Sequence, residues 1–257
     1  MPDDSVGGVA YYGVSANGLR GVLDFIFDEN NFTYELPDGK LIGLLGPSGC
    51  GKSTLLYCIS GMDKPSAGKI CFDGVDMADL TNKQMQELRL ERMGFVFQKT
   101  SFLKNLSIID NIVYPAFQLG EVNRSEIIKE ALSLMEEMGI SSIAENDIHK
   151  VSGGQLQRAA ICRAMINHPD VLFGDELTGA LNSSTTRDVL SIIDNINKKG
   201  TTVLLVTHDA NVAVHADKVI YLEDGRIMDT LNLGKYGGGN AGLRDTEMKS
   251  WLKKVKF

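Results

Sequence analysis

The sequence lacks the long hydrophobic run of a membrane-spanning helix, because apolar segments such as "TTVLLVT" are far shorter than the roughly 20 residues that a span needs. No basic region followed by an apolar stretch opens the chain, so we expect no secretory signal. The four cysteines form no C-x-x-C pair and have no nearby histidine at zinc spacing. This favours free thiols over disulfides or a zinc site, and a soluble protein of the cytoplasm.

An excess of positive charge is also missing. The formal net charge is −7, which argues against a nucleic-acid partner held by bulk electrostatics. Hydrophobic residues make up 43% and charged residues 23% of the 257 residues, as in an ordinary globular chain. This length suits one large α/β domain or two small ones.

The first part of the chain is rich in β-prone segments. Residues 5–37 contain "VAYYGV", "VLDFIF" and "NFTYEL" between turn residues, which predicts antiparallel strands. The fully apolar "KLIGLL" (40–45) predicts a buried parallel strand, followed by a helix from about Lys52 to Ser60. Thr81 and Gln84 stand at capping-box spacing and predict a helix that leads into the strand "MGFVF".

A helical insertion is expected at about residues 100–167. In "SEIIKEALSLMEEMGI" we expect Ser125 to cap a helix that carries one apolar face. That face would consist of Ile127, Ile128, Ala131, Leu134 and Met135. Strand-helix alternation then resumes with "DVLFGD", a helix at 184–199, "TTVLLVT" and "KVIYLEDGRI", which predicts a mostly parallel core sheet.

The end of the chain changes character. One large domain is expected over residues 1–233, and residues 234–257 are expected to form a flexible linker and a short amphipathic tail, "KSWLKKVKF". The basic tail could lie on an anionic membrane surface, but Trp251 packing on the domain is the preferred interpretation.

A phosphate-binding loop follows the strand at 40–45. The segment "GPSGCGKST" fits G-x-x-x-x-G-K-[ST] and opens a helix, which is the context this motif requires. Its glycines allow backbone N–H groups to surround a phosphate at the positive end of the helix dipole. Lys52 is expected to bridge the β- and γ-phosphates, and the Ser53 hydroxyl to ligate Mg²⁺. The predicted nucleotide-binding residues of this loop are Gly46, Pro47, Ser48, Gly49, Cys50, Gly51, Lys52, Ser53 and Thr54.

A second anion site is predicted at "VSGGQLQR" (151–158), where a serine and two glycines open another helix. With this motif in place the chain resembles the ATP-binding cassette (ABC) family from about residue 25 to 230. The resemblance implies an α/β phosphate-loop NTPase fold with a mostly parallel core sheet, an N-terminal antiparallel β subdomain and an α-helical insertion. It also implies a head-to-tail homodimer that holds two ATP molecules. The residues that would contact the partner's nucleotide are Ser152, Gly153, Gly154 and Gln155.

Further residues match the family's catalytic positions. Gln98 in "GFVFQ" resembles the Q-loop glutamine, which reaches the metal and the attacking water, although a glutamine that ends a strand can also be an ordinary surface residue. His208 in "LLVTHD" resembles the switch histidine that hydrogen-bonds the γ-phosphate. For the adenine-stacking aromatic, Tyr11, Tyr12 and Phe25 stay open as alternatives.

"VLFGDE" resembles the family's second phosphate-loop motif. Asp175 would hold Mg²⁺ through water, and Glu176 would orient or deprotonate the attacking water. Two departures follow. Leu177 stands where the family usually has proline, which is expected to loosen the loop slightly. Asn182 stands where the family usually has aspartate, which removes a charge near the dimer interface. We expect slower or differently coupled hydrolysis, with activity retained.

The loops "ELRLERMGFVFQKTSFLKNLSIIDNIVYPAF" and "GDELTGALNSST" resemble the lipoprotein-release, macrolide-export and antimicrobial-peptide-resistance subfamily. The resemblance implies an ATPase subunit on the inner face of the cell membrane. It would drive a separately encoded membrane permease docked near residues 99–117, with ATP and Mg²⁺ as cofactors. The alternative is a low-turnover regulatory or scaffolding subunit, as in cell-division-type relatives.

Overall fold

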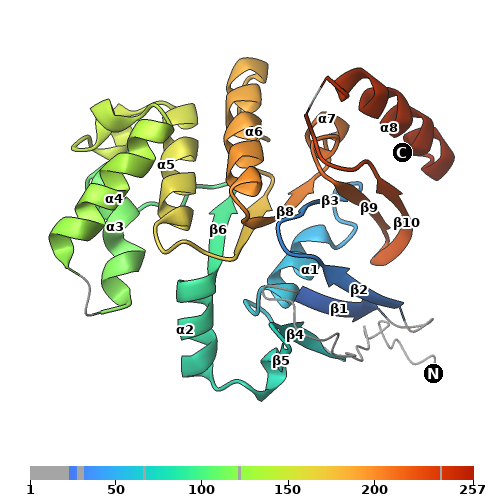
Figure 1. Cartoon of the computed structure of the whole chain (residues 1–257), viewed down its shortest axis with the longest axis horizontal. Coiled ribbons are helices and arrows are strands. Elements are labelled where there is room, and N and C mark those ends of the chain that lie inside the picture. Colours follow the sequence, from blue (N-terminus) through green and yellow to red (C-terminus); the bar gives the residue numbers. More distant parts are fainter. Residues whose placement is uncertain (1–22, 28–31, 66–67, 121–122, 238) are drawn as a thin grey trace, which may run out of the picture.

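The computed structural model describes residues 23–27, 32–65, 68–120, 123–237 and 239–257. A six-stranded core sheet runs through the middle of the molecule in the order β10-β9-β3-β8-β7-β6 (Figure 1). The strands from β9 to β6 are parallel, and only β10 runs antiparallel, so the predicted mostly parallel sheet is confirmed. The core strands are β3 (Leu41–Leu45), β6 (Met93–Phe97), β7 (Val171–Asp175), β8 (Thr202–Thr207), β9 (Lys218–Glu223) and β10 (Arg226–Asn232).

A second, antiparallel sheet has the order β2-β1-β4-β5. It confirms the predicted N-terminal β subdomain, although "VAYYGV", Tyr11 and Tyr12 lie outside the described residues. Phe25 lies in β1, opposite Tyr34 of β2. The strands of this sheet are β1 (Leu23–Phe27), β2 (Phe32–Leu36), β4 (Ile70–Phe72) and β5 (Val75–Asp76).

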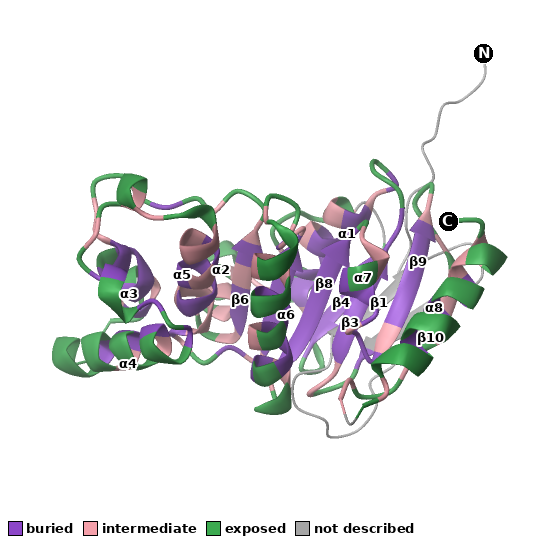
Figure 2. Ribbon diagram, turned by 90° about the horizontal axis from the view of Figure 1, so that it is seen from above, coloured by how far each residue is buried: buried purple, intermediate pink, exposed green. Residues whose placement is uncertain are grey.

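The core sheet is covered on both faces because alternate residues of its strands point to opposite sides. In β3, Ile42 and Leu44 join the cluster around α1, whereas Leu41 and Leu45 join the larger cluster on the other face. Figure 2 shows β3, β8 and β9 as buried strands, with exposed outer surfaces on α6 and α8. The helices on the sheet are α1 (Lys52–Ile59), α2 (Asn82–Arg92), α6 (Ser183–Lys198), α7 (Ala210–Ala213) and α8 (Ala241–Val255).

The helical insertion consists of α3 (Ile108–Gln118), α4 (Arg124–Glu137) and α5 (Gly153–Met165), which gather at one end of the molecule (Figure 1). Two details differ from expectation. Asn123 caps α4 in place of Ser125, because its side chain accepts a hydrogen bond from the Ser125 amide. Ile128 is exposed, because the buried stripe at helical spacing is Ile127, Ala131 and Met135. Short 3-10 turns occur at Met77–Asp79, Ser141–Ile143 and Ile148–Lys150.

The C-terminal helix is longer than the nine-residue tail expected from the sequence, since α8 has 15 residues. Trp251 is 6% exposed, and its ring packs edge-on against Tyr221 of β9 at 6.2 Å. The indole N–H donates to the Asp229 carboxylate of β10 at 3.1 Å, and Lys254 pairs with the same carboxylate. The interpretation that Trp251 packs on the domain is therefore confirmed. Within the part of the chain that the structure describes, no helix is both long and apolar enough to cross a bilayer.

Candidate active site: a phosphate loop beside a carboxylate–histidine pair

The phosphate loop lies between the end of β3 and the start of α1. A side chain at Gly46 would place its Cβ 2.1 Å from the Leu222 carbonyl oxygen, so only glycine fits there. Gly49 and Gly51 have φ angles of +83° and +99°, which other L-residues rarely adopt. The loop is tied to the β9–β10 turn, because Gly225 N donates to Cys50 O at 2.9 Å.

Lys52 is buried at the base of this loop, with 6% of its surface exposed. Its ammonium group donates to the carbonyl oxygens of Gly46 and Pro47 at 2.8 and 2.7 Å. Residues 47–49 are exposed, so a phosphate could approach the loop from solvent. The lysine charge is therefore held against the backbone of the loop that would surround a phosphate.

Ser53 and Asp175 meet beside the loop, since the Ser53 hydroxyl donates to Asp175 Oδ1 at 3.1 Å. Burial raises the pKa of Asp175, and the hydrogen bond from Ser53 opposes that rise. Among the described residues, no group of three or more His, Cys, Asp and Glu side chains could hold a metal. The hydroxyl and carboxylate oxygens present here are the donor type that Mg²⁺ prefers when phosphate oxygens complete its shell, so the pair fits that ion.

Tyr57 is a member of this site that the sequence reasoning missed. Its hydroxyl group lies 3.5 Å from Asp175 Oδ2, and burial followed by the nearby Asp175 charge raises the pKa of Tyr57. The signal was available, because Tyr57 follows Ser53 by four residues and therefore lies on the same face of α1.

Glu176 occupies the next position after β7 in a strained backbone conformation, with φ of +52°. Its amide donates to Val206 O of β8 at 2.9 Å, which helps to hold it there. Its carboxylate oxygen Oε1 lies 2.7 Å from His208 Nδ1. The structure thus brings the predicted glutamate and histidine into direct contact.

Gln98 reaches the same place from the end of β6. A Cβ atom added at Gly179 would lie 3.1 Å from Gln98 Nε2 and 3.4 Å from Glu176 Oε2, so both side chains lie over this glycine. Gly179 also donates its amide to the Glu176 carbonyl at 3.1 Å. The sequence reasoning missed Gly179. Because Gly179 has no side chain, the Gln98 amide and the Glu176 carboxylate can lie side by side over it.

The two departures from the family pattern have structural roles. Leu177 is 5% exposed and fills the space above Gly174, where a Cβ would lie 2.8 Å from the Leu177 side chain. Packing therefore anchors this loop at the position where the family usually has a proline ring. Asn182 caps α6, because its Oδ1 accepts from the Thr185 amide at 2.9 Å and from the Ser184 hydroxyl at 2.8 Å.

The second predicted anion site lies on a different part of the chain. Ser152 caps α5 in a capping box, since its hydroxyl accepts from Gln155 N and the Gln155 side chain accepts from Ser152 N. Ser152 and Gly153 are exposed at this helix start. Gly154 packs closely on α6, because an added Cβ would lie 2.6 Å from Thr185 Cγ2. This site sits in the helical insertion, apart from α1 in Figure 1.

The family model described as "ABC transporter" matches residues 29–179. The macrolide export ATP-binding/permease protein MacB of Haemophilus ducreyi is 40% identical over 197 residues, which is 76% of this chain and 28% of that protein. The lipoprotein-releasing system ATP-binding protein LolD of Leptospira interrogans is 38% identical over 217 residues, covering 84% of this chain and 91% of LolD.

Solved structures agree with these relatives. The dimeric structure of MJ0796, described as a bacterial ABC transporter cassette, has a TM-score of 0.74 and 31% identity, covering 85% of this chain and 98% of MJ0796. A second structure of the same cassette is described as a post-hydrolysis state bound to ADP and Pi. The chain spans only 28–33% of the MacB and syringafactin-export relatives, but about nine tenths of LolD. With its family model, relatives and structural neighbours in agreement, this chain belongs to the ABC transporter family.

Proposed function

We propose that this chain hydrolyses MgATP as the nucleotide-binding subunit of an ABC transporter and drives a separate membrane subunit. The observation that carries the proposal is the 2.7 Å contact between Glu176 and His208 beside the Ser53–Asp175 pair. A chain that only bound nucleotide would have no need for a strained glutamate at this point.

Each side chain has a separate task in hydrolysis. Lys52 would exchange its bonds to loop carbonyls for bonds to phosphate oxygens, while Ser53 and Asp175 hold Mg²⁺. The bound ion would neutralise charge on the phosphates. Glu176 would accept a proton from the attacking water, and His208 would hold that carboxylate and bond the γ-phosphate.

A second copy of the chain would complete the site. Ser152 and Gly153 are exposed at the start of α5, where free backbone N–H groups of the first turn can bind an anion. In a head-to-tail dimer this helix start would face the γ-phosphate on the partner. The dimeric structure of MJ0796 supports the formation of a dimer.

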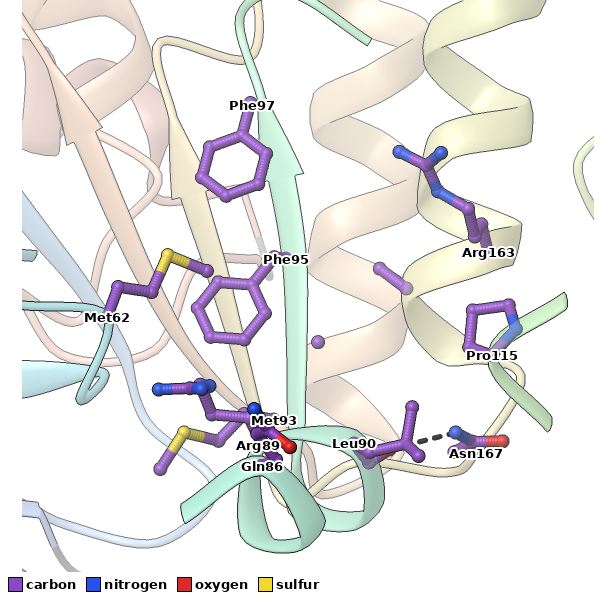
Figure 3. A pocket seen from close by; sticks show the side chains of 12 residues that line it. Met62, Gln86, Arg89, Leu90, Met93, Phe95, Phe97, Pro115, Arg163 and Asn167 are labelled. Carbon is purple, nitrogen blue, oxygen red and sulfur yellow. Dashed lines mark hydrogen bonds between the residues drawn. The ribbon is translucent and has the colours of Figure 1, made fainter. Parts of the chain in front are cut away.

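The membrane subunit would dock in a groove between β6 and the helical insertion. Figure 3 shows Phe95, Phe97 and Met62 on one side of β6, and Pro115 and Arg163 on the other. The groove encloses about 330 Å³. Phe97 directly precedes Gln98, so an apolar helix of the partner seated here would press beside the active site. Only Pro115 of the wall belongs to the predicted docking range 99–117.

Two side chains allow a matched test of this docking. Met62 and Leu132 are both 41% exposed, and only Met62 lines the groove. Met62→Arg is expected to abolish stimulation of ATP hydrolysis by the reconstituted membrane subunit while hydrolysis by the isolated chain continues. Leu132→Arg is expected to retain the stimulation. Equal stimulation in both variants would contradict docking in the groove. The membrane subunit would then have to dock on another face of the chain.

Steady-state MgATP hydrolysis tests the activity itself. The rate should rise more steeply than linearly with protein concentration, because each site needs two chains. Glu176→Gln keeps the size of the side chain but removes its basicity, and is expected to lower turnover by about 10²- to 10⁴-fold while ATP-dependent dimerisation persists. A wild-type rate equal to that of Glu176→Gln, both alone and with the membrane subunit, would favour a regulatory subunit that closes on ATP without turnover.

A further inference from the structure

Arg244 of α8 is a buried cation whose bonding capacity is fully used by the backbone. Its Nε donates to Val214 O at 3.0 Å, and Nη2 donates to Val214 O and Ala216 O at 2.8 and 2.6 Å. Nη1 donates to Leu233 O and Gly234 O at 2.9 and 2.7 Å. A guanidinium group has five N–H donors, and five hydrogen bonds are formed.

This arrangement is costly and specific to arginine. Arg244 is 2% exposed, and burial lowers its pKa, with the charge of Asp217 acting in the opposite direction. Among the described residues, no carboxylate forms an ion pair with it, and its hydrogen-bond partners are backbone carbonyls. A lysine ammonium could donate three hydrogen bonds at most and lacks the planar fork.

The carbonyls of Val214 and Ala216, which accept from Nε and Nη2 of Arg244, belong to the segment that leaves the active site. Asp209 follows His208 directly and caps α7 by accepting from Asn211 N at 2.8 Å. Val214 N donates to Ala210 O at 3.0 Å and closes the helix. One short hydrogen-bonded turn therefore separates His208 from the carbonyls that Arg244 holds.

A second contact joins this segment to α6. His215 lies in the sequence between Val214 and Ala216, whose carbonyls accept from Arg244. The His215 Nδ1 atom lies 2.9 Å from Asp194 Oδ2 of α6. Its ring stacks on Tyr236 at 4.1 Å, and the Arg244 guanidinium lies 5.3 Å from the centre of the same ring. His215 also lines a cavity of about 470 Å³ together with His208 and Glu176. The segment that follows His208 thus borders the same cavity as the two predicted catalytic side chains, His208 and Glu176.

We propose that Arg244 is a positioning residue for ATP hydrolysis, through which α8 fixes α7 and hence the distance between His208 and Glu176. The inference rests on the proposed ATPase function. Its physical basis is that a displacement of about 1 Å at a catalytic group can lower a rate by about 100-fold. The C-terminal helix then acts on the reaction without touching the nucleotide.

The test compares Arg244→Lys and Arg244→Gln with Trp251→Phe. Trp251 anchors the same helix on β9 and β10, through Tyr221 and Asp229, so its replacement weakens α8 without disturbing the carbonyls of Val214 and Ala216. We expect both Arg244 variants to lower kcat by about tenfold, with KM for ATP changed by less than about twofold. We expect Trp251→Phe to keep kcat within about twofold of wild type.

Two readouts separate positioning from loss of the fold. Trp251 is the only tryptophan in the chain, so its fluorescence reports whether α8 stays packed in the Arg244 variants. Amide hydrogen exchange over residues 209–216 reports the position of α7 even without turnover. Faster exchange there in Arg244→Lys, with native tryptophan emission, supports the proposal. Unchanged exchange, unchanged kcat or a red-shifted emission in Arg244→Lys overturns it, and so does an equal kcat loss in Trp251→Phe.

If the wild-type chain does not hydrolyse ATP, that result refutes the proposed function but not the role of Arg244 in holding α7. In that case the exchange of residues 209–216 still decides whether Arg244 holds α7. If Arg244→Gln does not fold, Arg244→Lys carries the comparison, because it keeps the charge and up to three of the five donors.

Discussion

Replacing Leu177 with alanine tests whether packing anchors the catalytic loop. Leu177 is 5% exposed, belongs to the same buried cluster as Leu205, and fills the space above Gly174. Removing a buried leucine side chain costs about 2–5 kcal/mol, which includes the cavity that is left. The rigid neighbouring strands β7 and β8 limit collapse into this cavity, so we expect a loss of about 3 kcal/mol.

Thermal unfolding measures this loss. For a chain of this size, 1 kcal/mol corresponds to roughly 2–4 °C in Tm, so Leu177→Ala should unfold about 6–12 °C below wild type. Leu243→Ala is the control, because Leu243 is 77% exposed and its truncation should change stability by less than about 0.5 kcal/mol. A Tm change for Leu177→Ala no larger than that of the control would refute the packing argument and restore the expectation of a loose loop.

Three further predictions concern the interface and the metal site. Asn182→Ala removes the cap of α6 and should cost about 1 kcal/mol in thermal unfolding, whereas Asn182→Asp should keep the cap and the stability. Gly154→Ala places a Cβ 2.6 Å from Thr185 Cγ2 and should weaken ATP-dependent dimerisation on size-exclusion chromatography; adding Thr185→Ser should restore it. Since burial raises the pKa of Asp175 above its ordinary value, ionisation of this carboxyl group destabilises the nucleotide-free fold as the pH rises through the raised pKa. Asp175→Asn should therefore stabilise the nucleotide-free chain at neutral pH in urea titrations, by a margin that vanishes in acid, where Asp175 is protonated in both the folded and the unfolded chain. A margin that grows on acidification would contradict this cause.

The site could be predicted from sequence where its chemistry is carried by residues at fixed local spacing. Lys52 and Ser53 follow a strand within one motif, and Asp175 and Glu176 end another, so the parallel order of the strands brings them to one edge of the sheet. The errors arose where local signals compete. Asn123 and Ser125 are both good helix caps, and their relative use depends on where the chain enters α4.

Arg244 lay beyond sequence reasoning for a different reason. Its partners are backbone carbonyls, including those of Val214 and Ala216 about 30 residues away, and a backbone carbonyl has no residue type that a pattern could reveal. The expected basic tail, "KSWLKKVKF", does not include Arg244, and its lysines kept a membrane-surface helix open only as the alternative to packing of Trp251. Only the folded chain distinguishes the arginine that is buried on α7 from the exposed lysines that share its helix. A buried guanidinium group whose five N–H donors are all bonded fixes the positions of the carbonyls that it contacts. In this chain those carbonyls include Val214 O and Ala216 O, which end the turn that follows His208.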